Sequence, residues 1–520
     1  MIEQTRSILS NRRFLGRWLT VLLFSVLSVA GIAFSVYLMF IANSFGLYLL
    51  AAAFTCLSVI AGFFNLYASV LYYRSYLYDG YLARIKSTLK PIRRFPTVAL
   101  AVPIYNEEAD MVDRNVASLL TMRYPKDKIK VYMLDDSTDQ SIRKKMVAIA
   151  KKYHVQYLHR EDRKGFKAGA VNNMLKHSKE EYVAIFDSDE RLVNPNFLLD
   201  TIPYFDLGNV SYVQTIKKYD KGTFFSGAVD IFDAFFFNFI QPARALNNTA
   251  IFAGSCGVIS RKALDEIGGL PEYIIEDTFF SFESDSHNYQ SLYVPEVYAL
   301  GRPVKTFTEL AKQQWRYNYG DTQFISYFIK KKGFTKRTPL SNMDYITHGF
   351  GLNYLSVILI LFTLVSIGIV FSAVPLAHIN LATFFTQNTL SIDLECLGFF
   401  AFTLSLLTPV LLTKVYFGSL SKGFMVFLLN YALAFVRAKA AIATLFNKNP
   451  GFHWNRLKVN NGQRGLLFAV SNTKTEIVFA STMFVLSFLA LSQSDLSGCI
   501  WLIWYGILYL LATIFLHKYG

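Results

Sequence analysis

The chain has 520 residues, of which 53% are hydrophobic and 17% are charged, and its formal net charge is +15. The length exceeds that of one ordinary domain, and the low charged fraction argues against a purely soluble protein. A charge this positive would suit a nucleic-acid-binding protein, but the basic residues flank apolar stretches, which indicates membrane lipids as partners and no nucleic acid.

Apolar segments near both ends of the chain are long enough to cross a bilayer, which takes about 20 residues. No Asp, Glu, Lys or Arg occurs between Arg17 and Arg74, or between Asp344 and Asp393. We expect six transmembrane helices, near residues 18–42, 47–73, 350–373, 396–413, 477–491 and 499–516. Only 14 uncharged residues separate Lys422 from Arg437, fewer than the ~18 of a span, which predicts an interfacial helix there.

The distribution of Lys and Arg predicts the orientation of these helices. Residues 1–17 carry four arginines and residues 414–475 carry nine Lys or Arg. The connections 43–46, 374–395 and 492–497 carry none. Because positive loops favour the cytoplasmic side, we expect a multi-pass protein of the plasma membrane with both termini and its central domain in the cytoplasm.

Between the apolar regions the sequence alternates short apolar runs with helical patterns. Runs at 98–103, 128–134, 155–158 and 182–186 are predicted strands, and helices are expected up to 120, up to 153 and over 164–176. This alternation predicts an α/β domain with a mostly parallel sheet. A helix within 222–246 is expected to pack between the sheet and the membrane-side helices, because Asp230 and Asp233 make it a poor span.

The predicted organisation therefore has five parts. Residues 1–73 form a transmembrane hairpin, and the aromatic and basic residues 74–94 form an interfacial helix, with an ordinary surface helix as the alternative. The α/β domain covers 95–320 and an interfacial segment covers 321–345. Residues 346–520 form a second transmembrane region, which includes the cytosolic interfacial helix and loop 414–475.

Two aspartates follow the predicted strand that ends at Phe186. Asp187 and Asp189 are separated by one residue, so a strand-like backbone would direct both carboxylates to one side. Ligands of open α/β sheets bind at this end of the strands. Paired carboxylates suit Mg²⁺ or Mn²⁺, which also bind phosphates of a substrate. Taken alone, such a pair is more often a set of solvated loop aspartates, and the accompanying motifs favour a site.

Further acidic and basic motifs follow in a definite order. Asp135-Asp136 comes first, then Asp187-Ser-Asp189, Ile275-Glu276-Asp277 and Gln313-Gln-Trp315-Arg316-Tyr317. With this order, the chain resembles membrane-embedded family 2 glycosyltransferases, the group of cellulose, mannan, chitin and hyaluronan synthases, whose signature is D, DxD, TED and QxxRW. Three more segments support the resemblance: 103–108, 163–172 and 252–261.

The sequence departs from that signature at two positions. Ile275 replaces the threonine of TED, so a hydroxyl is lost while both acids remain. Tyr317 replaces the terminal tryptophan and offers a smaller aromatic face. The threonine-rich gating loop of the family has only a weak counterpart at 452–458, to which we assign no role.

The resemblance implies a GT-A catalytic domain and roles for particular residues. Asp277, with Glu276 beside it, would be the catalytic base, and Asp189, with Asp187 nearby, would hold Mg²⁺ or Mn²⁺. The predicted nucleotide contacts are Pro103, Tyr105, Glu107, Asp136, Lys167, Asp187 and Arg316. The predicted acceptor contacts are Gln313, Tyr317, Trp315 and Cys256. Asp135 could replace Asp136 in its role, and Trp315 could instead belong to the core.

We expect an inverting, metal-dependent transferase that uses a nucleotide sugar, with UDP as the expected carrier, to extend a polysaccharide and pass it through the membrane. One alternative is a non-processive transferase that glycosylates a lipid acceptor, such as a sphingolipid or polyprenyl phosphate. A second is a transporter or channel with a nucleotide-sensing domain. The absence of charged residues within the predicted spans weakens this second alternative.

Overall fold

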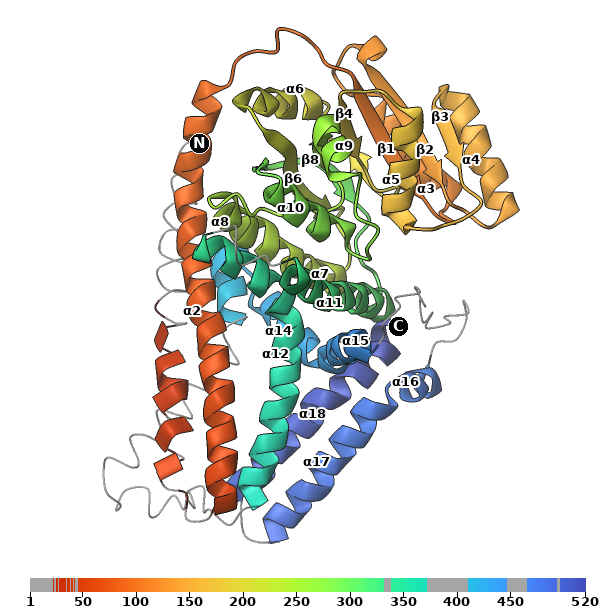
Figure 1. The fold of residues 1–520 in the computed structure, drawn as a ribbon. Helices are drawn as coiled ribbons and strands as arrows, with labels where there is room; N and C mark the ends of the chain where they lie inside the picture. The colour runs from red at the N-terminus through yellow and green to blue at the C-terminus, as the bar shows by residue number, and fades with distance from the viewer. Residues whose placement is uncertain are drawn as a thin grey trace.

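The computed structural model describes residues 45–331, 338–371, 410–446, 465–492 and 496–520, together with parts of 22–42. Figure 1 shows a sheet with its helices at one end of the molecule. The long helices α2 (Phe45–Thr88), α12 (Pro339–Phe371), α17 (Lys474–Ser492) and α18 (Leu496–Tyr519) extend away from the sheet. The predicted combination of an α/β domain with an α-helical region is confirmed.

The sheet has eight strands in the order β3-β2-β1-β4-β7-β6-β8-β5. Their bounds are β1 Val98–Ile104, β2 Ile129–Asp135, β3 Gln156–His159, β4 Tyr182–Ile185, β5 Arg191–Leu192, β6 Val210–Tyr219, β7 Gly257–Ser260 and β8 Gln290–Gly301. Four of its seven strand pairings are parallel and three are antiparallel. The sheet is therefore mixed, where the sequence predicts mainly parallel strands. The antiparallel pairings all involve β5 or β7, short strands outside the four predicted ones.

Strand β1 shows why this region folds as a central strand. Its alternating residues contribute to two apolar cores, Val98 and Leu100 on one side and Ala99 and Ala101 on the other. All four side chains are fully buried. A strand that is covered on both faces reads as a continuous apolar run, as the sequence does here. The helices that pack around the sheet as a whole are α3 Ala109–Leu119, α4 Gln140–Tyr153, α5 Phe166–His177, α6 Phe197–Thr201, α9 Arg261–Ile267 and α10 Glu276–Ser286.

A layer of helices lies between the sheet and the long apolar helices (Figure 1). It contains α7 Phe224–Phe235, α8 Gln241–Ala245, α11 Phe307–Lys330, α14 Leu420–Ala432 and α15 Ala434–Phe446. Phe225 and Val229 of α7 share an apolar core with Phe427 of α14 and Leu508 of α18. This confirms the prediction that the 222–246 segment packs against the membrane-side helices.

Three described helices are long and apolar enough to cross a membrane: Tyr48–Thr88 within α2, Lys474–Ser492 and Gly498–Tyr519. A fourth candidate is the pair α14 and α15, which passes the same test together but is bent by 41°. The bend lies inside the segment for which the sequence predicts an interfacial helix. Within α12, the apolar segment Ser356–Val365 is too short to meet the same test.

Among the described residues there are thus three or four candidate spans, so the predicted count of six is not confirmed. The span predicted at 18–42 falls largely on residues that the structure does not describe, as does the one at 396–413. Helix α2 also runs without a break from Phe45 to Thr88. The span predicted at 47–73 and most of the interfacial helix predicted at 74–94 are therefore one helix, which ends at Thr88. No proline interrupts it before Pro91, and the single Gly80 is tolerated within a helix.

Candidate active site

Two adjoining pockets lie where the carboxyl ends of several strands meet α10 and α11. The larger pocket has a volume of about 460 Å³ and the smaller about 270 Å³. Both are lined by Asp187, Asp189, Lys217, Arg302, Arg316 and Tyr317. We call the larger one the donor pocket and the smaller one the side pocket. Residues separated by more than 200 positions in the sequence therefore form one site.

The loop after β4 carries the two aspartates that the sequence singles out. The backbone N–H of Asp187 donates to Glu190 Oε2 at 2.8 Å, and the N–H of Glu190 donates to the backbone oxygen of Asp187 at 3.0 Å. Asn115 of α3 donates to the backbone oxygens of both Asp187 and Glu190. These bonds hold the loop in a tight turn at the edge of both pockets.

The two aspartates have different surroundings. Lys167 Nζ lies 2.5 Å from Asp187 Oδ1, and Lys217 Nζ lies 3.0 Å from Asp187 Oδ2. These ammonium groups hold the pKa of Asp187 well below its ordinary value, against the effect of burial. Asp189 has no ion-pair partner among the residues that the structure describes, and burial and the neighbouring Asp187 raise its pKa.

Glu276 and Asp277 lie in the first turn of α10 and line the donor pocket. Asp277 Oδ1 accepts a bond of 2.8 Å from the N–H of Thr278. Burial raises the pKa of both Glu276 and Asp277, while Lys167 opposes this rise. A carboxylate whose pKa is raised toward neutrality is suited to accept a proton at ordinary pH.

Gly254 fits closely between these groups. Its φ is +82°, and a Cβ placed on it would lie 3.3 Å from Asp277 Oδ2 and 3.5 Å from Lys167 Nζ. Gly254 thus brings the backbone of the 252–256 loop directly against the acid and the lysine. A glycine is suited to such a position because it adopts positive φ without strain and adds no side chain.

The far end of the donor pocket is aromatic and charged. The Arg163 guanidinium carbon lies 3.2 Å from the centroid of the Tyr105 ring. Asp136 also lines this end, and its carboxylate is bound by Arg160 through bonds of 2.8 and 2.5 Å. Burial and the neighbouring Asp189 raise the pKa of Glu107, another lining residue, to about 7.

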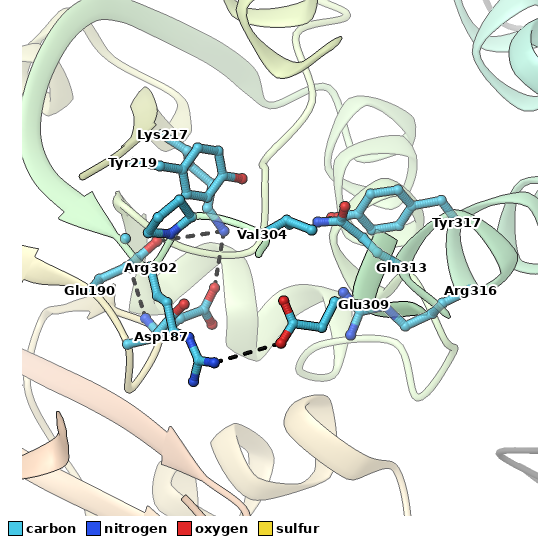
Figure 2. A pocket seen from close by; sticks show the side chains of 13 residues that line it. Asp187, Glu190, Lys217, Tyr219, Arg302, Val304, Glu309, Gln313, Arg316 and Tyr317 are labelled. Atoms are coloured by element: carbon cyan, nitrogen blue, oxygen red, sulfur yellow. Dashed lines mark hydrogen bonds and ion pairs between the residues drawn. The ribbon is translucent and has the colours of Figure 1, made fainter. Parts of the chain in front are cut away.

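The side pocket lies between the ends of β6 and β8 and one face of α11. Figure 2 shows Gln313, Arg316 and Tyr317 of α11 facing Lys217 and Tyr219 across it. Gln313 Nε2 lies 3.2 Å from the Tyr317 hydroxyl. The pocket therefore combines an aromatic ring with amide and guanidinium donors, a set that suits sugar hydroxyls and phosphate oxygens.

The donor groups allow a divalent cation at one of the two aspartates. Asp187 would have to release a lysine before it could bind a metal ion, whereas Asp189 has no competing cation among the described residues. No group of three or more His, Cys, Asp or Glu in the described chain is arranged to hold a metal ion. Mg²⁺ is often held by one or two carboxylates together with substrate phosphates, and Asp189 fits such a site.

Comparison with known proteins agrees with this geometry. Residues 99–268 match the model of glycosyl transferase family 2. This part of the chain is thus similar to family 2 glycosyltransferases. Two curated relatives are the cellulose synthase catalytic subunit [UDP-forming] of Pseudomonas fluorescens and a probable glucomannan 4-beta-mannosyltransferase of Oryza sativa subsp. japonica. Each is 28% identical, over 281 and 272 residues.

The alignments cover 50% and 49% of this chain, but only 37% and 46% of the two relatives. The chain thus spans less than half the length of these proteins. A solved mannosyltransferase of Pyrobaculum calidifontis, in complex with GDP-Man and Mn²⁺, aligns with 74% of this chain at 17% identity and a TM-score of 0.49. The alignment covers 99% of that chain.

Most residues predicted from the sequence lie together at these two pockets. The donor pocket is lined by Pro103, Tyr105, Glu107, Asp136, Lys167, Asp187, Asp189, Glu276, Asp277, Arg316 and Tyr317. Gln313 lines the side pocket. Asp135, the alternative to Asp136, is fully buried and accepts bonds from the Tyr157 hydroxyl and the Ser137 N–H.

Two residues predicted to bind the acceptor lie outside both pockets. Trp315 stacks on Tyr319 of the same helix, with ring centroids 5.0 Å apart. Cys256 is 1% exposed within the main core of the domain, and burial raises the pKa of its thiol. Cys256 therefore belongs to the core, whereas Trp315 is half-buried beside Tyr319 and lines neither pocket.

The donor pocket is also lined by Lys217, Arg302 and Arg163, to which the sequence motifs assign no role. Lys217 lies in β6, and Arg302 directly follows β8. Lys217 and Arg302 are basic residues at the carboxyl end of a strand, where ligands of α/β sheets bind. Strands β6 and β8 are not among the four predicted strands, so this signal was not available.

Proposed function

We propose that this protein is an inverting glycosyltransferase that takes sugars from a nucleotide donor, with UDP as the expected carrier, and extends a polysaccharide that passes through the membrane. The observation that carries the proposal is the donor pocket, where Asp136, Asp189 and Asp277 from three distant segments line one cavity with Arg316. The family 2 domain and its synthase relatives support the same reaction class.

The nucleoside would lie at the Tyr105 end of the donor pocket, and the diphosphate between Asp189 and Arg316. The planar Arg316 guanidinium is suited to two phosphate oxygens at once. Mg²⁺ or Mn²⁺ on Asp189 would supply positive charge to the diphosphate. Asp136 is already paired with Arg160, so it would orient that arginine as well as contact the nucleoside.

In the transfer step, an acceptor hydroxyl attacks the anomeric carbon of the donor sugar. Asp277 takes the proton of this hydroxyl as the new glycosidic bond forms. The bond between the sugar and the phosphate breaks, and the nucleoside diphosphate leaves with the electron pair. The acceptor would approach from the side pocket, where the Tyr317 ring offers a flat face against which a sugar can pack.

The elements next to the site suit a polymer product. Helix α11 carries four side-pocket residues and packs against α12, one of the long apolar helices, and against α15 of the intermediate layer. A growing chain that leaves the acceptor site would therefore meet the membrane-side helices directly. The main alternative is transfer to a lipid acceptor, and the size of the product distinguishes this alternative from polymer synthesis.

The first experiment is a donor panel. Purified full-length protein in lipid nanodiscs is incubated with UDP-glucose, UDP-N-acetylglucosamine and GDP-mannose, and release of nucleoside diphosphate is measured. We expect release with at least one donor, together with glycan formation. Absence of turnover with every nucleotide sugar would refute the proposal.

The orientation is tested separately in intact cells. In a background without the native cysteines, single cysteines near residues 385 and 495 should react with an impermeant thiol reagent added outside. A cysteine near residue 455 should not react. External labelling near 455 would mean that the α14–α15 pair crosses the membrane and that the proposed six-span arrangement is wrong.

A further inference from the structure

The side chain of Lys217 lies at the border of the donor pocket and the side pocket. It projects from β6, is 19% exposed, and lines both cavities. Its ammonium group lies 3.0 Å from Asp187 Oδ2 and 3.5 Å from Glu190 Oε1 (Figure 2). Among the described residues, it is the only lysine that lines both pockets.

Asp187 and Glu190 each have another partner besides Lys217. Asp187 is already paired through its other oxygen with Lys167. Glu190 accepts a bond of 2.6 Å from the Ser255 hydroxyl and another of 2.8 Å from the N–H of Asp187. An ammonium group has three N–H donors, and the structure assigns one of them, to Asp187. Lys217 thus retains capacity for an anion in the cavity that it lines.

The local backbone directs Lys217 to this place. The pairing of β6 with β8 is irregular on both sides of Ile216, between Thr215 and Lys218. Such irregularities re-aim individual side chains and occur next to active sites. The adjacent Lys218 is exposed and lines neither pocket.

Lys217 and Arg316 lie on opposite sides of the side pocket (Figure 2). One comes from the sheet and the other from α11, and both also line the donor pocket. An anion at the border of the two pockets would therefore have a cation on each side. A diphosphate needs such compensation because three acids, Asp187, Asp189 and Glu190, lie along the same wall.

We propose that Lys217 binds the diphosphate of the donor and stabilises its terminal phosphate as the nucleotide leaves. The lysine would turn from Asp187 to the phosphate when the donor enters, which its flexible four-carbon side chain allows. As the sugar–phosphate bond breaks, negative charge grows on the leaving oxygen, and a fixed cation there lowers the barrier. This inference rests on the proposed function, because it assumes a nucleotide-sugar donor.

The test compares Lys217→Met with its neighbour Lys218→Met in the full-length protein. Calorimetry measures the affinity for UDP and for UMP, and for GDP and GMP, because only the diphosphates carry the terminal phosphate. In Lys217→Met we expect the diphosphate affinity to fall roughly 10- to 100-fold, as for the loss of one charge-assisted hydrogen bond. The monophosphate affinity should stay within about twofold. Lys218→Met should change neither, and Lys217→Arg should recover part of the loss.

Three outcomes would overturn the inference. Unchanged diphosphate affinity in Lys217→Met would show that the lysine does not bind the phosphate. Equal losses for diphosphate and monophosphate, not recovered by Lys217→Arg, would show a purely structural role. If the unmodified protein bound no nucleoside diphosphate, the proposed function would fail and this inference with it.

Discussion

Arg74 of α2 and Asp344 of α12 form a buried ion pair, although the two residues lie 270 positions apart in the sequence. Arg74 Nη1 and Nη2 donate to the two oxygens of Asp344 at 2.9 and 3.1 Å. The same carboxylate accepts a bond from Thr249 at 2.5 Å, and further bonds from Tyr67 and Asn247. Asp344 therefore joins α2 and α12 to the loop between α8 and β7 of the α/β domain.

Loss of one partner of this pair should destabilise the protein. Asp344→Asn would leave the Arg74 guanidinium buried without a counter-charge, which costs about 3–5 kcal/mol for buried pairs. Chemical denaturation in detergent measures the change for Asp344→Asn, Arg74→Gln and the double variant. The matched control is Lys86→Gln, which removes an exposed pair between the same helix α2 and Glu296, where about 0–1 kcal/mol is expected. Similar losses at both pairs would contradict the joining role of Asp344.

Asp277→Asn tests the catalytic base. The substitution keeps the shape of the side chain but removes its ability to accept a proton, so transfer should fall by about 10²- to 10⁴-fold. Affinity for nucleoside diphosphate should persist, as measured by calorimetry. The control is Asp265→Asn, at an exposed acid of α9 that is paired with Arg261. Transfer at the unmodified rate would remove Asp277 from the mechanism.

The pH dependence of kcat/KM also tests the role of Glu276 and Asp277. Burial raises the pKa values of Glu276 and Asp277, and a base acts only when it is deprotonated. In the unmodified enzyme, the fall of kcat/KM on the acid side should therefore occur at a higher pH than the ordinary carboxylate value near 4. An acid limb centred near 4 would argue against a base with a raised pKa.

Gly254→Ala should impair transfer more than it impairs folding. The new Cβ would lie 3.3 Å from Asp277 Oδ2, so this carboxylate would have to shift by a few tenths of an ångström, and such a displacement should lower the rate by roughly 10- to 100-fold. Gly268→Ala is the control, because Gly268 also has a positive φ, of +93°, but no atom within 4 Å of the added carbon. Both variants should lose similar stability from backbone strain. Equal activities would mean that the space around Gly254 is not needed for transfer.

The assignment of a divalent cation to Asp189 predicts that chelation stops the reaction. Treatment with EDTA should abolish transfer, and added Mg²⁺ or Mn²⁺ should restore it. Asp189→Ala should not be rescued by the metal, while its thermal unfolding in detergent should remain cooperative. Full activity in excess EDTA would contradict a metal at this site.

Local structure in the first half of the catalytic domain followed closely from the sequence. The predicted strand 98–103 is β1 Val98–Ile104, and the predicted strand 182–186 is β4 Tyr182–Ile185. Both are apolar runs bounded by polar residues, so local pattern and burial agree. The carboxyl ends of β2 and β4 bring Asp136 and Asp187 to one pocket, as expected for strands that run parallel in one sheet.

What the sequence could not show depends on contacts between distant segments. The pairing of Arg74 with Asp344 has no local signal, although the two residues mark the limits of the predicted apolar stretches. The placement of Lys217 depends on an irregular pairing of β6 with β8. The predicted boundary at residue 73 does not coincide with a helix end, because the fall in hydropathy there does not interrupt the helical backbone of α2.

The growth of the product with time tests the central claim most directly. Purified protein in nanodiscs receives a donor sugar and no added acceptor, and product length is followed by electrophoresis or mass spectrometry. We expect products that lengthen with time. Tyr317→Ala should lower elongation far more than hydrolysis of the donor, whereas Trp315→Ala, at a residue outside both pockets, should spare elongation. A product of one fixed size that forms only with an added lipid acceptor would contradict polymer synthesis.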